Sequence, residues 1–226
     1  MIHSLLTPQF LGNLTLNISL GAYLIWFLPQ VILNFKRKNT DGLSLGMHGI
    51  LLLGYLCDLL YGFGRSMEWQ YRLVTIMGLC CLALQHYQFF RYGQHTRQQK
   101  VAYRYLNVVY LVLLVYAVLA ISKLTYSASF YVFAGLLANS CWLIYMLPQV
   151  LTNFQNKSTE GLSILFVLIG AFLNLCDLNT AWLLHWDYPS KLGPAIGFLV
   201  KIVVLIQIYY YAKQQRTPGE RLVASC

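Results

Sequence analysis

Charged side chains are scarce in this sequence: they make up 10% of its 226 residues, against 58% hydrophobic residues. A soluble chain of this length needs roughly twice that charged fraction to cover its surface, so the composition excludes an ordinary soluble domain. The hydrophobic residues gather in seven apolar stretches, each near the ~20 residues with which a helix crosses a bilayer. These stretches cover residues 10–35, 43–63, 73–92, 102–122, 127–153, 162–184 and 192–212. We therefore predict an all-α membrane protein with a single transmembrane domain over residues 1–226.

The patterns of metal centres and enzyme active sites are missing as well. The six cysteines form no CxxC pair and no His/Cys ligand spacing, and five of them lie inside apolar stretches. We interpret them as small packing residues. The sequence contains no nucleophile–base pair and no phosphate-binding loop, so we expect neither an enzyme nor a cofactor. Tyr and Trp are spread through the spans instead of accompanying a basic face, which speaks against nucleic-acid binding.

The distribution of basic residues predicts the orientation in the membrane. With seven spans, eleven Lys and Arg fall on one side and four on the other. The positive-inside rule then places the C-terminus in the cytosol and the N-terminus outside or in a lumen. The N-terminus lacks the basic flank of a cleavable signal peptide, so we expect the first span to stay in the mature protein.

One stretch of the sequence occurs twice. Residues 24–45 read LIWFLPQVILNFKRKNTDGLSL and residues 143–164 read LIYMLPQVLTNFQNKSTEGLSI, with 13 of 22 positions identical at an offset of 119. The register continues to Tyr92 and Tyr211, which indicates two copies of one unit. Two three-span copies need a linking span to share an orientation. We predict a 3+1+3 arrangement with a first three-helix repeat over 1–92, a linker helix over 93–124, and a second three-helix repeat with a cytosolic tail over 125–226.

Each repeat has a proline inside its first span. Pro29 and Pro148 lack an amide hydrogen and crowd the carbonyl four residues earlier, so each predicts a kink. The amides of Gln30 and Gln149 follow directly and are expected to satisfy the freed backbone groups. Equivalent kinks in two repeats favour a pair of hinges beside a cavity, although two static bends are an alternative.

The repeated segment resembles the PQ-loop repeat family. In both copies Pro-Gln is followed by Asn-Phe and by Lys-x-Thr-[Asp/Glu]-Gly-Leu-Ser. The second half resembles the cystinosin-like branch, whose members transport cystine with protons. This likeness rests on Pro148-Gln149, Asn153-Phe154, Lys157-Ser158-Thr159-Glu160-Gly161, Pro189-Ser190-Lys191-Leu192-Gly193 and Gln207. The resemblance covers nearly the whole chain and implies two three-helix bundles around a substrate path.

The sequence departs from the cystinosin-like pattern at two acids. Lys201 stands where that pattern has an aspartate in the last span, and Gly170 stands where it has an acid in the sixth. The other ionisable residues well inside spans are Asp58 and Asp177, at the same position of the two repeats, and such charges usually face a cavity or a partner. We predict that Lys201 pairs with Asp177. Asp58 then has no basic partner and is the stronger of the two proton-coupling candidates, the alternative being a purely structural role.

Polar side chains in the spans are candidates for contacts with a substrate. A site with Lys201, carboxylates and amides suits the carboxylate and the ammonium of an amino acid. Asn13 and Asn17 lie one turn apart on one helix face, which we expect to point into the protein, either toward a substrate or into a helix–helix hydrogen bond. The substrate-binding candidates are Lys201, Asn13, Asn17, Asn139, Asn174, Gln207, Trp142 and Tyr145. We interpret His48 and His86 as packing residues.

These features predict a transporter of cystine or a related small amino acid, which moves its substrate toward the cytosol by alternating access with protons. Two alternatives stay open. One is a PQ-loop transporter of another cargo, a cationic amino acid or a sugar. The other is a non-transporting, receptor-like protein of the same fold, for which the basic run Lys36-Arg37-Lys38 would be a docking surface. The expected partners are the substrate, protons and the lipid bilayer, in a bacterial inner membrane or a eukaryotic endomembrane.

Overall fold

The structure is a computed structural model that describes residues 7–93, 97–123, 126–186 and 188–223. Within these ranges the chain is almost entirely helical, and they contain no β-strand. The helices are α1 (Pro8–Trp26), α2 (Leu28–Arg37), α3 (Leu45–Gly64), α4 (Trp69–Tyr92), α5 (Arg97–Lys123), α6 (Ala128–Ile144), α7 (Leu147–Asn156), α8 (Ile164–Leu183) and α9 (Tyr188–Val223). They supply seven candidate membrane spans, because α1 with α2 and α6 with α7 each form one. The predicted seven-span, all-α fold is confirmed.

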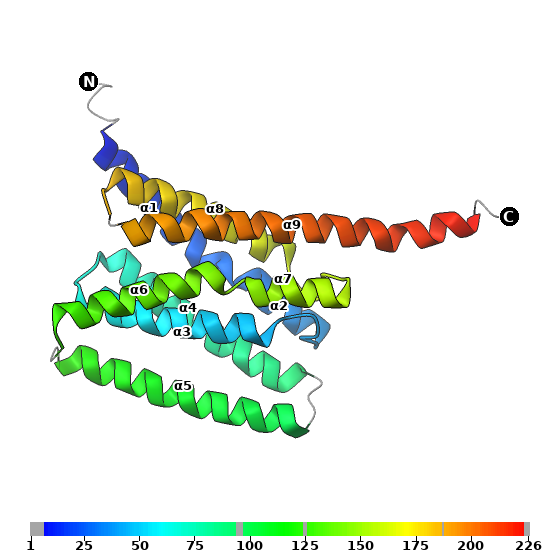
Figure 1. Cartoon of the computed structure of the whole chain (residues 1–226), viewed down its shortest axis with the longest axis horizontal. Helices are drawn as coiled ribbons and strands as arrows, with labels where there is room; N and C mark the ends of the chain where they lie inside the picture. The colour runs from blue at the N-terminus through cyan, green and yellow to red at the C-terminus, as the bar shows by residue number, and fades with distance from the viewer. Residues whose placement is uncertain (1–6, 94–96, 124–125, 187, 224–226) are drawn as a thin grey trace.

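The kinks predicted at the two prolines are present as breaks in the first span of each repeat. Helix α1 ends before Phe27 and α6 ends before Tyr145, and the next helix begins one residue before Pro29 or Pro148. A proline in the interior of a helix cannot donate to the carbonyl of the preceding turn, so the axis bends there. The bend turns α2 and α7 relative to α1 and α6 at one end of the bundle (Figure 1).

Each repeat packs its first helix against the second helix of the other repeat. Helix α1 contacts α8, and α6 contacts α3 in the same way. Helices α4 and α9 flank these pairs, while α5 lies along α3 at the edge of the bundle (Figure 1). Helix α5 has no equivalent in the second repeat. This is the predicted 3+1+3 arrangement, and it places most of the interface between the repeats on four helices.

The loops after α2 and α7 meet back to back. Their glycines, Gly42 and Gly161, have φ angles of +87° and +97°. A β-carbon on Gly42 would lie 1.9 Å from the Glu160 carbonyl oxygen, and one on Gly161 would lie 2.1 Å from that of Asp41. Only glycine fits this conformation and this approach. We call the end of the bundle formed by residues 38–44 and 157–163 the loop end.

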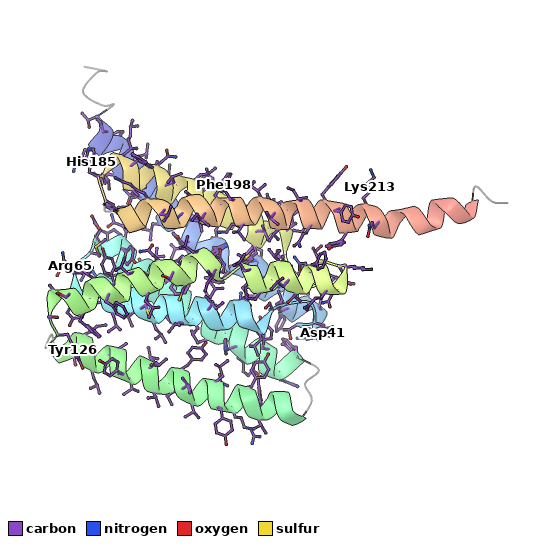
Figure 2. All side chains as sticks on the ribbon, viewed as in Figure 1. Asp41, Arg65, Tyr126, His185, Phe198 and Lys213 are labelled. Atoms are coloured by element: carbon purple, nitrogen blue, oxygen red, sulfur yellow. The ribbon has the colours of Figure 1, made fainter. Side chains whose placement is uncertain are left out.

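The two ends of the bundle are well separated. Asp41 lies at the loop end, whereas Arg65, Tyr126 and His185 lie at the other end (Figure 2). We call this other end the open end, because the cavity between the repeats, described below, reaches it.

Candidate functional site

One cavity lies between the two repeats, in the half of the bundle away from the loop end. Its volume is about 130 Å³, and α1, α3, α4, α6, α8 and α9 all contribute to its wall. Along α1 the lining runs from Leu16 to Trp26, and along α6 it stops at Tyr145, just before the kink. Its residues at the open end include Gln70 and Trp186. The cavity therefore ends at the level of the two helix breaks.

Both membrane aspartates line this cavity, and each is bonded to the opposite repeat. Asp177 accepts hydrogen bonds from Tyr23 Oη and Ser19 Oγ of α1, both at 2.6 Å. Asp58 accepts one from Trp142 Nε1 of α6 at 2.8 Å and another from the Tyr71 hydroxyl of α4. Tyr23 and Trp142 occupy the same position of the two repeats. The carboxylates therefore link the repeats across the cavity wall with charge-assisted hydrogen bonds.

The predicted ion pair between Lys201 and Asp177 is wrong. In the described part of the chain Lys201 and Asp177 form no ion pair, whereas Arg37 and Glu160 do. Lys201 is only 2% exposed, and its Nζ lies 5.3 Å from the centroid of the Tyr145 ring and 5.9 Å from that of Trp26.

Gly170 explains where the lysine goes instead. A β-carbon on Gly170 would lie 2.7 Å from Lys201 Cε and 2.8 Å from Trp26 Nε1. The missing side chain of Gly170 therefore makes room for the lysine stem. Gly170 lies seven residues before Asp177 on α8, about 10 Å nearer the loop end. The ammonium accordingly lies beside the rings of Trp26 and Tyr145, outside the cavity lining, within electrostatic range of Asp177 but not in direct contact with it.

Three polar atoms around the cavity have no hydrogen-bond partner among the described residues. They are Tyr55 Oη, Tyr145 Oη and Asn174 Nδ2. Tyr55 and Asn174 are equivalent in the two repeats, and each lies over an equivalent glycine, Gly78 or Gly197. A buried polar group without a partner costs roughly 1–3 kcal/mol, so these groups are available to a ligand. They add hydroxyl and amide donors to the two carboxylates.

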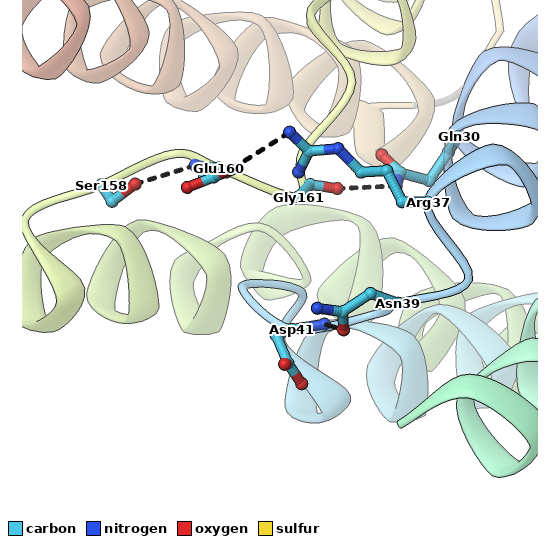
Figure 3. Close-up of polar contacts among 7 residues, drawn as sticks. All are labelled: Gln30, Arg37, Asn39, Asp41, Ser158, Glu160 and Gly161. Atoms are coloured by element: carbon cyan, nitrogen blue, oxygen red, sulfur yellow. Dashed lines mark hydrogen bonds and ion pairs between the residues drawn. The ribbon is translucent and has the colours of Figure 1, made fainter. Parts of the chain in front are cut away.

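The glutamines after the prolines do not satisfy their own helices as predicted. Gln30 donates to the Gly161 carbonyl at 2.9 Å (Figure 3). It also accepts from the Ser163 amide at 2.8 Å. Gln149 makes the same pair of bonds with Gly42 and Ser44, both at 2.8 Å. The expectation fails because loop peptide groups outside any helix need partners, and one carboxamide offers both a donor and an acceptor.

A second layer of amides holds each of these glutamines in place. Gln30 donates to Asn34, which donates to Gln88 at 3.0 Å, and Gln88 donates to the Val31 carbonyl. The second repeat has the same chain, through Asn153, Gln207 and the Val150 carbonyl. We call these two chains together with their loop bonds the amide latch.

The structure places four predicted substrate-binding residues outside the cavity lining. Gln207 belongs to the amide latch, and Lys201 lies beside the two aromatic rings named above. Asn13 and Asn17 are exposed, and the Asn17 side chain accepts from Gln70 at 3.4 Å. Their helix face is therefore exposed and does not point inward as expected, but the alternative, a helix–helix hydrogen bond, is present for Asn17 because Gln70 belongs to α4.

The remaining candidates line the cavity: they are Asn139, Trp142, Tyr145, Asn174, Asp58 and Asp177. Sequence reasoning missed Ser19, Tyr23, Tyr55 and Tyr71. The available signal was the repeat register, because Tyr23 stands at the position of Trp142, which was recognised as a candidate.

Seven spans in a 3+1+3 arrangement, with two carboxylates in a cavity between the repeats, define a multi-pass membrane protein. Comparison with known proteins identifies the family. The model of the PQ loop repeat matches residues 11–71 and 130–189, which together cover more than half of the chain. The chain belongs to the PQ-loop repeat family.

The curated relatives include cystinosins and vacuolar transporters. The chain is 26% identical over 227 aligned residues to a cystinosin homolog of Dictyostelium discoideum, covering 85% of this chain and 78% of the relative. It is 25% identical to cystinosin of Bos taurus, covering 88% of this chain and 62% of the relative, so it spans less than two thirds of that protein. A match to the vacuolar histidine transporter YPQ3 of Saccharomyces cerevisiae, at 27% identity, covers 37% of this chain and 28% of that protein.

A solved structure of a eukaryotic SWEET transporter has the same fold. Its TM-score is 0.66 at 16% sequence identity, and the match covers 90% of this chain and 99% of that one. At this identity the likeness concerns the fold alone.

Proposed function

We propose that this chain is a proton-coupled transporter of cystine or a related small amino acid. The observation that carries this proposal is the pair of equivalent carboxylates, Asp58 and Asp177, in one cavity between the repeats. A carboxylate can bind the ammonium of an amino acid, and the unpartnered groups of Tyr55, Tyr145 and Asn174 can donate to its carboxylate. The names of the cystinosin relatives support the substrate class.

The pair of equivalent carboxylates in the cavity favours a substrate with two similar ends. Cystine carries an ammonium and a carboxylate at each end of a disulfide. One end would lie between Asp58 and Tyr55, and the other between Asp177 and Asn174, since these are equivalent pairs on α3 and α8. A single small amino acid would engage one half of the site.

Asp58 is our candidate for proton coupling. Its carboxylate accepts from two neutral donors, Trp142 and Tyr71, and therefore joins α3 to both α6 and α4. A proton on Asp58 removes negative charge from these bonds and weakens the link to α6 of the other repeat. Proton binding would in this way favour a rearrangement of the repeats. Asp177, with Ser19 and Tyr23 as donors, is the second candidate.

Transport requires the loop end to open. In this structure the amide latch and the contact between Gly42 and Gly161 hold the two repeats together there. We propose that residues 1–92 and 125–226 move against each other about hinges at Pro29-Gln30 and Pro148-Gln149, with residues 93–124 as the link. The amide latch then breaks and re-forms once in each cycle. The basic residues would place the loop end in the cytosol, and the vacuolar relative supports an endomembrane location.

Lys201 would meet the substrate on its way out. The ammonium lies beside the rings of Trp26 and Tyr145, between the cavity and the loop end. When this wall opens, Lys201 can bind a substrate carboxylate. The same charge disfavours a cationic amino acid as cargo.

Uptake of labelled cystine into proteoliposomes tests the proposal. We expect uptake that rises with an acid-outside pH gradient and is not reduced by excess arginine or glucose. If arginine or glucose reduced cystine uptake, the proposed substrate would change from cystine to a cationic amino acid or to a sugar, respectively. Correctly folded protein that transports none of these three would favour the receptor-like alternative.

A further inference from the structure

A second cavity, of about 430 Å³, lies outside the interface between the repeats, among α3, α4 and α5. All three helices belong to candidate membrane spans. The lining residues Tyr87, Phe90 and Leu111 are exposed, at 58%, 49% and 62%, so the cavity opens sideways to the bilayer. Molecules that fill such an opening come from the lipid phase.

A buried histidine faces this apolar space. His86 is 8% exposed and lines the cavity, with the Tyr110 ring edge-on at 5.7 Å. Neither of its ring nitrogens forms a hydrogen bond with a described residue. Asn107 of α5 lines the same cavity and is exposed. Unsatisfied polar groups within a bilayer are costly, so the histidine calls for a polar partner, and Asn107 can bind the same partner.

The repeat register shows that this polarity is local. The second repeat has Leu205 at the position of His86, Val204 at that of Gln85, and Val167 at that of His48. His48 and Gln85 are buried and contact each other beside His86. These three polar residues, His48, Gln85 and His86, occur only in the first repeat, against which α5 packs. Helix α5 has no equivalent beside the second repeat. The fold that the two repeats share therefore does not require these polar residues.

The lining indicates the chemistry of the partner. No Lys, Arg, Asp or Glu lines the cavity among the described residues, so it offers nothing to neutralise a phosphate. His86 lies six residues before the end of α4, about 9 Å inward from the loop end. Leucines from α3, α4 and α5 form the deeper wall, including Leu52, Leu79 and Leu114. A volume within the roughly 300–1,000 Å³ of small-ligand pockets suits one compact molecule.

We propose that this cavity binds an uncharged membrane lipid with a free hydroxyl group. The hydroxyl bonds to His86 and Asn107, and the apolar body lies along the leucines. The site uses no residue of the transport cavity, so this proposal is independent of the proposed function and can be tested separately.

Photolabelling in phosphatidylcholine liposomes tests this site. Two probes, a diazirine analogue of cholesterol and one of diacylglycerol, are applied separately to the purified full chain. We expect one of them to label peptides of α4 and α5 around Tyr87 and Leu111, and its unlabelled parent lipid to compete. The active probe identifies the kind of lipid. Equal labelling of α5 and of the lipid-facing side of α9 by both probes would overturn the proposal.

Matched variants make the test specific. His86→Leu installs the residue of the second repeat and should reduce labelling about fivefold, as expected for one lost hydrogen bond. Leu111→Trp should reduce it by filling the cavity, whereas Val112→Trp, at an exposed position outside the lining, should not. If His86→Leu fails to fold, the comparison of Leu111→Trp with Val112→Trp still tests whether the lipid binds in this cavity. Labelling that Leu111→Trp and Val112→Trp change equally would contradict a site in this cavity.

Discussion

The two repeats are alike at the loop end and differ around the cavity. In the amide latch, Gln30, Asn34 and Gln88 make the same bonds as Gln149, Asn153 and Gln207. Around the cavity, equivalent positions of the two repeats hold different residues: Tyr55 corresponds to Asn174, Leu51 to Gly170, and Leu82 to Lys201. The symmetric residues hold the repeats to each other, and we infer that the asymmetric ones adapt a common frame to one substrate. Substitutions in the two regions should therefore have different effects.

The largest effect is expected where the two loops touch. Gly161→Ala places a β-carbon 2.1 Å from the Asp41 carbonyl oxygen at a φ of +97°. It should lower the stability of the folded protein by at least about 2 kcal/mol, because both the contact and the backbone conformation exclude a side chain. Thermal unfolding in detergent measures this. Gly21→Ala is the control, since nothing lies within 4 Å of that site. Equal stability of the two variants would contradict the loop contact.

Removal of either latch glutamine should have the next largest effect. Gln149→Leu loses two bonds to the opposite loop and leaves the Ser44 amide and the Gly42 carbonyl without partners, at a net cost of roughly 1–3 kcal/mol. Gln30→Leu should weaken the folded state by the same amount, because its bonds are equivalent. Denaturation of both variants compares the repeats directly. Clearly unequal losses of stability in the two variants would contradict the equivalence of the two halves of the amide latch.

The asymmetric pair, Gly170 with Lys201, should affect transport more than folding. Lys201→Leu installs the residue of the first repeat and should lower cystine uptake about tenfold, the loss expected for one charge-assisted hydrogen bond to a carboxylate. Gly170→Ala should destabilise the protein through its clash with the lysine stem and Trp26. This destabilisation should shrink in a Lys201→Leu background. A purely additive double variant would show that the two positions are not coupled.

The smallest effect is expected at the ion pair on the surface of the loop end. Arg37 and Glu160 are 3.2 Å apart, with side chains 41% and 72% exposed (Figure 3). Solvent screens such pairs, so Arg37→Ala should change stability by less than about 1 kcal/mol and leave uptake unaltered. Chemical denaturation and an uptake assay check this. A loss comparable to that of Gln149→Leu would mean that charge, and not the amides, holds the loops together.

The sequence was sufficient for the fold because its signals are local or repeated. Span length, the 119-residue register and the two prolines predicted the seven spans, the 3+1+3 arrangement and the kinks. The cavity position of Asp58 and Asp177 agreed with the expectation for charges inside a membrane. These inferences need no knowledge of how distant segments meet.

The errors concern contacts between distant segments. Gln30 bonds to residues more than 130 positions away, and nothing near it in the sequence names them. Lys201 was paired with the nearest acid by height in the membrane, but the space beside Gly170 determined its direction. The absence of a side chain at Gly170 was visible in the sequence, although its consequence required the packing of α8 on α9. Asn13 and Asn17 were placed inside because polarity alone does not fix which helix face is covered.

The most direct test of the central claim compares the pH dependence of uptake in the wild type, Asp58→Asn and Asp177→Asn. Asparagine keeps the size and the hydrogen-bonding ability of aspartate but cannot take up a proton. Labelled cystine uptake into proteoliposomes is measured with and without an acid-outside gradient, at equal amounts of folded protein. We predict that Asp58→Asn loses the stimulation by the gradient, while Asp177→Asn keeps it at a lower rate of uptake. Unchanged stimulation in Asp58→Asn would contradict proton coupling through this residue.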